Sequence, residues 1–331
     1  MPNINVERLS SPSKIETGSY KKTKHCFFFQ SKLFEAQITE LFDDLWPTVT
    51  AIKNLRWQVN GYYHETGVKQ NVKLTARFVD QEDKTNRPNL YRSCIEQTWE
   101  QQEFQISRNF LTNLFAIYEG WIETILPQLD TVKRNPKDFH FPSSFRTTLM
   151  TMQSGADPVL VHAFYNCYVL KSKHYNISHL DNYYLIYRYF KECRNCIIHN
   201  GGHADQKLIN AYNSINGLTE KDLDVLEVPH IHPALSLNEM VKLSLRGVVG
   251  FSQILMKIVS TLDVEFIKAP LAKECFIQQV KEFNPYPLYP SPDESKMKKM
   301  LEGIMSRSGF LPANYSDAFY NLLTAQGVLK I

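Results

Sequence analysis

Several features that would reveal a function directly are missing from this chain. Its 331 residues contain no phosphate-binding P-loop, no HExxH motif and no cluster of Asp and Glu suited to a metal. No apolar run approaches the roughly 20 residues of a membrane span. The polar start of the chain lacks the apolar core of a signal peptide. We therefore expect a cytoplasmic protein that stays out of membranes and uses no cofactor or metal.

Strong charge of one sign is missing too, as are internal repeats and low-complexity tracts. The formal net charge of +3 is too small to indicate nucleic-acid binding by itself. The apolar content is ample for a buried core, and the length suits one large domain or two modest ones.

The cysteine pattern does not suggest a disulfide framework, because the six cysteines are scattered except for one close pair. That usage fits a reducing cytosol. The pair is Cys193 and Cys196, followed by His199 and His203, and these are residue types that bind zinc. The pair falls inside an expected helix, however, and no second pair completes a tetrahedral site. We interpret the two cysteines as small apolar residues on a packed face.

The spacing of apolar residues predicts an all-α protein with little extended structure. A helical pattern over 27–60 is expected to be split in two by Pro47. Alternating residues at 72–78 permit one short strand, and 223–237 suggests a small hairpin or extended loop. Further helices are expected at 143–152, 156–175, 239–262 with Asn238 as its cap, 296–305 and 315–324.

The strongest helical pattern covers 91–126 and is expected to end at Pro127. It carries two adjacent apolar stripes, which indicates burial on two sides, at the centre of a bundle or against a second chain. Glu119 interrupts the apolar pattern. It is either an exposed or salt-bridged carboxylate, or a residue that faces a functional site.

The most informative segment runs from Tyr183 to Gly202. It reads as an amphipathic helix that ends in Arg194-Asn195-x-x-x-His199 and is stopped by two glycines. Asn195 and His199 are four residues apart and share a face. Gly201 is the natural left-handed residue after a helix end. A guanidinium, a carboxamide and a titratable imidazole are therefore expected to gather in the last turns.

The start of the same helix raises two further questions. Asp181 is expected to cap it. Four tyrosines precede the motif and could stack on nucleobases, but their spacing is typical of a core stripe, which is the interpretation we favour. They are Tyr183, Tyr184, Tyr187 and Tyr189.

An Arg and a His together offer charge compensation for a phosphate and proton transfer near neutral pH. This pairing suits chemistry on a phosphodiester. A structural interpretation stays open, because the helix dipole favours basic residues near any helix C-terminus.

Arg194, Asn195 and His199, with the aromatic helix before them and the glycine stop after them, resemble the RxxxxH motif of the HEPN superfamily. The resemblance implies a HEPN-like up-down helical bundle over 91–263, with a small extended or hairpin insertion. The resemblance does not cover the rest of the chain. Residues 1–25 are polar and mildly basic, which favours a flexible basic arm, although such an arm could also help to hold RNA. The helical patterns at 26–90 and 264–331 predict N- and C-terminal helical extensions.

The resemblance also implies a metal-independent endoribonuclease, as in family members that act as toxins or in defence against phage. Arg194 and His199 would be the catalytic pair, and Asn195 would support them. We add Glu119 and His203 as candidate auxiliary residues. RNA is the implied partner, together with a second copy of the chain in a homodimer. An antitoxin or another regulatory protein could restrain the activity.

Two other interpretations remain open at the level of sequence. The domain could bind nucleotides or RNA through Arg194 without cleaving them. Alternatively, the protein could be a helical interaction module, such as an antitoxin or adaptor, in which Arg194 and His199 are structural.

Overall fold

A computed structural model describes residues 26–79, 88–229 and 231–330. These residues form helices joined by loops, with no β-strand among them, so the predicted all-α class is confirmed. Two isolated bridges, His203 to Met240 and Leu288 to Leu329, are the extended pairings within that described part. The predicted arm at 1–25 lies outside the described residues.

The α-helices differ widely in length, from single turns to the 38-residue α1. They are α1 (Phe29–Thr66), α2 (Asn71–Phe78), α3 (Trp99–Leu129), α4 (Phe145–Gln153), α5 (Pro158–Leu160), α6 (Asn166–Lys171), α7 (Leu180–His199), α8 (Gln206–Ile215), α9 (Glu220–Leu223), α10 (Leu245–Glu265), α11 (Ala272–Phe283), α12 (Glu294–Arg307) and α13 (Asp317–Ala325). Short 3-10 or π segments are η2 (Tyr91–Glu96), η3 (Pro136–His140), η4 (Val161–Tyr165), η5 (Ile177–His179) and η6 (Phe266–Lys268).

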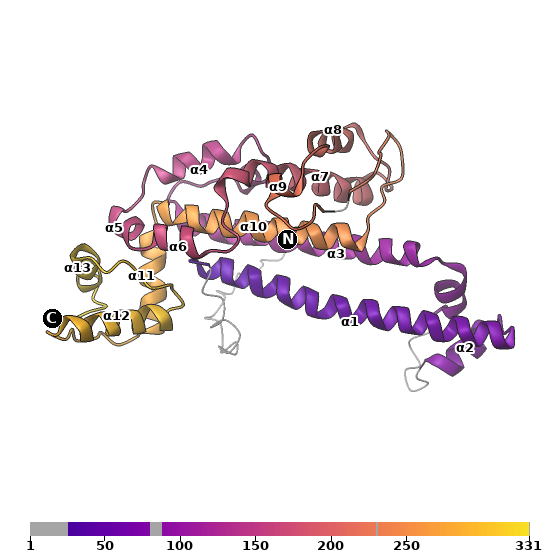
Figure 1. Ribbon diagram of the computed structural model, residues 1–331, viewed down its shortest axis with the longest axis horizontal. Coiled ribbons are helices and arrows are strands. Elements are labelled where there is room, and N and C mark those ends of the chain that lie inside the picture. The colour runs from indigo at the N-terminus through magenta and orange to yellow at the C-terminus, as the bar shows by residue number, and fades with distance from the viewer. Residues whose placement is uncertain (1–25, 80–87, 230, 331) are drawn as a thin grey trace, which may run out of the picture.

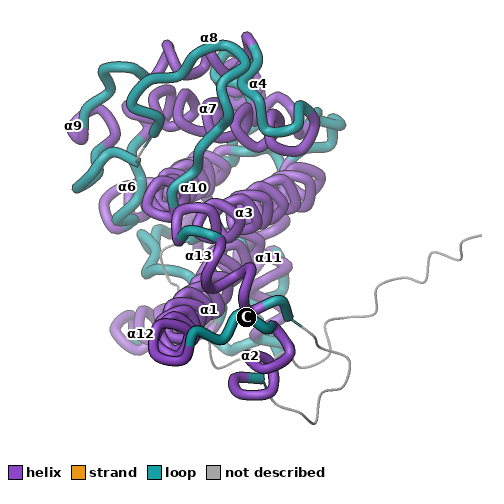
Figure 2. The backbone as a smooth tube through the Cα atoms, turned by 90° about the vertical axis from the view of Figure 1, so that its right-hand side faces the viewer, coloured by secondary structure: helices purple, strands orange, loops and turns teal. Residues whose placement is uncertain are grey.

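The helix α3 lies at the centre of the bundle, in contact with α1, α7 and α10 (Figure 1). Viewed end-on, α3 and α10 form a middle layer between α7 with α8 on one side and α1 on the other (Figure 2). Both apolar stripes of α3 are therefore buried within one chain, as Leu114 and Phe115 show. The alternative, burial of this helix against a second chain, is wrong.

The helix α10 owes its apolar composition to the same core. Contrary to the expectation that no apolar run approaches a membrane span, α10 and η6 together form one stretch, Leu245–Lys268, that is long and apolar enough to cross a membrane by length and composition alone. In the fold, 78% of its most apolar window is buried inside the molecule. Packing against α3 and α7 accounts for that composition, so the stretch is weak evidence for a membrane span.

Two prolines that were expected to divide or end helices do neither. Pro47 lies inside the continuous α1, and Pro127 lies inside α3, which continues to Leu129. Both prolines are exposed, so water can satisfy the backbone carbonyl that each one leaves without a partner. Leu45 and Val49 are buried on either side of Pro47, and this packing holds α1 together through the proline.

The segment expected as a strand at 72–78 is instead the helix α2. Leu74 and Phe78 are four residues apart and pack into a small second core with Val59 of α1. The alternation at 72–78 was misleading because Val72 is an exposed residue on the outer face of the helix.

The helix expected over 91–126 is interrupted at its start. The π-helical η2 ends at Glu96, and Thr98 then begins α3 with a reciprocal capping box to Gln101. That S/T-x-x-Q pattern is a local start signal, and it overrides the continuous helical pattern.

The last long helix begins later than expected. Ser244, not Asn238, caps α10, and Asn238 adopts a left-handed conformation with φ of 64°. Residues 239–241 instead run beside the turn after α7, where Val241 N donates to Gly202 O at 2.8 Å. No hairpin forms over 223–237 in the described residues, which follow an irregular path after α9.

The chain ends in three helices that extend the main core. α11 begins soon after α10 and contacts α3 and α12, and Phe276 of α11 packs on Phe310 with a ring-centroid distance of 5.0 Å. The expected helices at 296–305 and 315–324 are confirmed as α12 and α13, and those at 143–152 and 156–175 correspond to α4 and to α5–α6. The boundaries of the 91–263 domain stay a prediction.

Candidate active site at the end of α7

The helix α7 ends at the predicted place. The N–H groups of Asn200 and Gly202 both donate to Cys196 O, at 2.9 and 3.0 Å. Gly201 and Gly202 have φ values of 62° and 86°, in the region that glycine adopts without steric cost. A Cβ on Gly202 would also lie 3.0 Å from the Met240 sulfur. This stop fixes His199 as the last helical residue.

The start of α7 differs from the prediction. The residue before the helix is His179, which makes no side-chain cap, and Asp181 lies in the first turn. Its carboxylate instead receives hydrogen bonds from Arg146 Nε at 2.8 and 2.9 Å. A short 3-10 segment, η5, leads directly into α7 and so leaves no extended cap position for an aspartate.

The residues that precede the motif belong to the core. All four tyrosines of the stripe are buried, so they cannot stack on bases, and the core interpretation is confirmed. Cys193 and Cys196 are fully buried as well, on the packed face that was predicted. Burial raises the pKa of both thiols, which keeps them protonated.

Arg194 lies between α7 and α3. Its guanidinium donates to Asn195 Oδ1 at 3.1 Å and approaches Glu119 at 3.3 and 3.5 Å. It also sits over the Phe115 ring, 5.4 Å from the centroid. The side chain is 20% exposed, so it is held in place but open to solvent on one side.

Glu119, proposed from a break in the apolar pattern, faces this arginine. It also lies 3.7 Å from Lys191 Nζ, one turn before Arg194. The next carboxylate, Glu192, receives Arg188 at 2.5 Å and Asn195 Nδ2 at 3.3 Å. Three cations on the last turns of α7 therefore face two carboxylates, Glu192 on the same helix and Glu119 on α3. This group carries one positive charge in excess.

His140 of η3 completes the cluster. Its Nδ1 lies 2.8 Å from Lys191 Nζ. Burial, together with the nearby charges of Lys191 and Arg194, lowers the pKa of His140 to about 3. The ring is thus neutral at physiological pH, and with Nδ1 accepting from an ammonium, its proton resides on Nε2.

Three polar atoms around this cluster are buried without a hydrogen-bond partner. They are Arg194 Nε, His140 Nε2 and Tyr187 Oη. The His140 and Tyr187 ring centroids are 6.1 Å apart, and Lys191 Nζ lies 5.6 Å from the Tyr187 centroid. Buried donors without acceptors are costly, so the cluster is short of acceptors.

His199 and His203 are exposed beyond this cluster. His203 Nδ1 lies 3.0 Å from the Asn238 carbonyl oxygen. In the described part of the chain, the His199 ring has no hydrogen bond or ion pair. It is also about 140° around the helix from Arg194. The fold therefore joins Arg194, Asn195 and Glu119 directly, and leaves both histidines outside that contact.

Lys191 and His140 were missed at the level of sequence. Lys191 could have been found, because it is three residues before Arg194 and so lies on a neighbouring position of the same helix. Nothing in the sequence marks His140, which comes from a loop-like segment 51 residues before Lys191.

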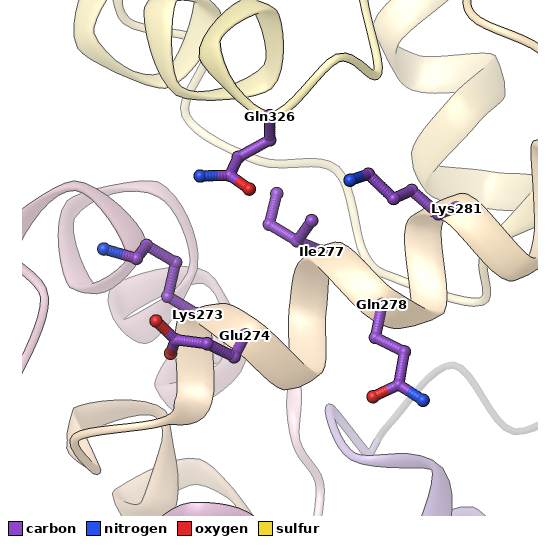
Figure 3. Close-up of a pocket in the computed structure, with 6 residues that line it drawn as sticks. All are labelled: Lys273, Glu274, Ile277, Gln278, Lys281 and Gln326. Atoms are coloured by element: carbon purple, nitrogen blue, oxygen red, sulfur yellow. The ribbon is translucent and has the colours of Figure 1, made fainter.

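A separate groove of about 320 Å³ lies on α11, next to Gln326 (Figure 3). Its lining includes Lys273 and Lys281, and Lys273 is already paired with Asp157 at 3.0 Å. None of the motif residues contributes to this groove. It is not part of the site at the end of α7.

The chain was compared with protein-family models, curated protein sequences and solved structures. No protein-family model, no curated protein sequence and no solved structure matches the chain.

Proposed function

We propose that the protein is a metal-independent endoribonuclease with a HEPN-like helical domain, acting in the cytoplasm as a toxin or phage-defence effector. One observation carries the proposal. The Arg194 guanidinium is fixed by Asn195 and Glu119, and the exposed imidazole of His199 lies at the end of the same helix.

These groups suit cleavage of RNA by its own 2′-hydroxyl. The hydroxyl oxygen attacks the adjacent phosphorus and loses its proton to a base, and the 5′-oxygen of the next nucleotide leaves with a proton from an acid. His199 handles these protons, and Arg194 stabilises the charge on the phosphorane oxygens. The products are a 2′,3′-cyclic phosphate and a 5′-hydroxyl, without a nucleophile from the protein.

The surroundings of the site also favour a nucleic acid. Phe141 is an exposed aromatic ring beside the cluster, with Arg188 4.8 Å and Lys191 5.7 Å from its centroid. An accessible aromatic next to cations is the combination with which proteins bind single-stranded RNA.

The separation of Arg194 from His199 within one chain favours a shared site. A two-fold homodimer that brings two copies of this helix end together would supply two arginines and two histidines around one phosphate. The apolar side chains Ile198 and Met240 are 48% and 45% exposed, next to His199 and the glycine turn. They offer the apolar contact that such an interface needs.

The first test replaces each member of the pair. Arg194→Ala and His199→Ala should each lower the rate of RNA cleavage by about 100-fold or more, because each removes a group that acts in the transition state. His199 is exposed, so its loss should leave the melting temperature nearly unchanged. His64→Ala, an exposed histidine on α1, is the matched control. Full activity in both site variants would contradict the assignment.

The second test asks whether cleavage needs a metal ion and whether two chains share one active site. Cleavage should continue in EDTA and leave cyclic-phosphate ends. Mixing Arg194→Ala and His199→Ala subunits should restore part of the activity, since a mixed dimer keeps one intact copy of each residue. A fully active monomer in sedimentation, or an absolute need for Mg²⁺, is the opposing result.

Binding of nucleotides or RNA without cleavage is the second candidate. The contact between Arg194 and Glu119, and the distance of His199 from it, favour this alternative. The helical interaction module, with an antitoxin or other regulatory protein as partner, is distinguished by strong destabilisation of both single variants.

A further inference from the structure

The cations on α7 are unequally neutralised. Arg188 is paired closely with Glu192, at 2.5 Å. Arg194 and Lys191 instead share the single carboxylate of Glu119, at 3.3 and 3.7 Å. These two contacts are long for ion pairs. Glu119 is therefore a weak counter-ion for two cations that lie one turn apart.

The Glu119 carboxylate contacts Arg194 and Lys191 in the way that a bound anion would. Arg194 contacts both carboxylate oxygens, at 3.3 and 3.5 Å, and one of them, Oε1, also lies 3.7 Å from Lys191 Nζ. Two non-bridging oxygens of a phosphate can satisfy two cations in the same way. Glu119 is 28% exposed, Arg194 20% and Lys191 13%, so an external anion can approach the cations from solvent.

The buried donors without partners give an independent reason to expect an acceptor here. His140 is only 8% exposed, and its Nε2 proton has no acceptor. Arg194 Nε and Tyr187 Oη lack partners in the same cluster. His140 also accepts a hydrogen bond from Lys191, which holds the ammonium group on the side of the cluster that faces Glu119.

We propose that Lys191 is a second phosphate-binding cation beside Arg194, and that Glu119 occupies the phosphate position in the free protein. The ligand is a backbone phosphate of RNA, which displaces the carboxylate as it binds. Lys191 contacts the phosphate, and His140 is a positioning residue that acts through Lys191. This inference rests on the proposed ribonuclease site and names the residues that hold its substrate.

The test measures binding in the absence of cleavage. Calorimetric titration with inorganic phosphate at fixed ionic strength gives one dissociation constant, and titration with a 2′-O-methyl RNA tetranucleotide, which lacks the attacking hydroxyl, gives the other. Glu119→Gln should tighten both by about five- to tenfold, because it removes a competing charge from a partly exposed pair. Glu123→Gln, an exposed glutamate one turn further along α3, is the matched control and should change neither.

Replacement of the lysine tests its role. Lys191→Met in the Glu119→Gln background should abolish the gain, and Lys191→Arg should retain it. Lys207→Met, an exposed lysine on α8, is the control. Binding by Glu119→Gln equal to that of Glu123→Gln, or a gain that survives Lys191→Met, overturns the proposal.

Comparison of the two ligands shows whether the site binds free phosphate or a phosphate of the RNA backbone. A gain for inorganic phosphate alone would overturn the assignment to the RNA backbone. Because binding needs no turnover, a protein that binds both ligands as described but never cleaves RNA would contradict the proposed reaction and leave this inference intact.

Discussion

Two charge clusters lie next to α3, one of them buried and the other partly exposed, and they differ in how completely their groups are paired. In the first, Asp263 of α10 accepts from the N–H groups of Phe27 and Phe28, at 2.5 and 3.0 Å, and Lys32 donates to Gly309 O at 2.8 Å. In the second, Glu119 faces Arg194 and Lys191 at 3.3 to 3.7 Å. The hydrogen bonds of the first cluster are short, and the ion-pair contacts of the second are long.

The difference indicates different roles. Asp263 is fully buried and accepts from the two N–H groups that immediately precede α1, a helix without a side-chain cap of its own. That cluster links the start of α1 to α10 and to the turn at Gly309. The cluster around Arg194 is open to solvent and short of acceptors. Such an arrangement adds little to stability and suits a ligand.

The largest expected effect on stability is at Asp263. Asp263→Ala should lower the free energy of unfolding by about 3 kcal/mol or more, because two buried N–H groups lose their acceptor at roughly 1–3 kcal/mol each. Urea unfolding followed by circular dichroism measures the loss. Asp263→Asn keeps one acceptor oxygen and should be affected less. A loss below about 1 kcal/mol for the alanine variant would remove the contrast between the clusters.

A smaller effect is expected from the titration of His140. The folded-state pKa of about 3 lies below the unfolded value of about 6.5, so between these values only the unfolded chain takes up the proton. Stability is therefore lost as pH falls below 6.5. From pH 7.5 to pH 5, the wild type should lose on the order of 2 kcal/mol relative to His140→Gln. Parallel pH profiles of the two proteins would refute a buried neutral histidine.

The smallest effect is expected at Glu119. Glu119→Gln should change the free energy of unfolding by less than about 1 kcal/mol, because its ion pairs are long and partly exposed. Thermal unfolding next to Asp263→Ala gives the comparison directly. A destabilisation as large as that of Asp263→Ala would mean that Glu119 is a structural residue, and that the two clusters serve the same purpose.

Two of the differences between the predicted and the observed helices have the same cause. Pro47 and Pro127 predict breaks in the helical pattern, but buried neighbours hold each helix through an exposed proline. At 239–243 the sequence predicts a helix and the structure has none. A helical pattern continued, but the backbone of Val241 pairs with Gly202 on the turn after α7. In each case a tertiary contact decided between two local conformations of similar free energy.

The sequence by itself determined that the protein is helical, where α7 ends, and that Arg194, Asn195 and His199 come from one helix end. These follow from apolar periodicity and from the left-handed glycine at 201, which are local properties of the chain. Only the tertiary structure decided the partners of Arg194. Glu119 is 75 residues away in the chain, and this contact arises because the apolar faces of α3 and α7 pack together. An ion pair between distant segments leaves no periodic signal in the sequence, because its partners meet only after the core has formed.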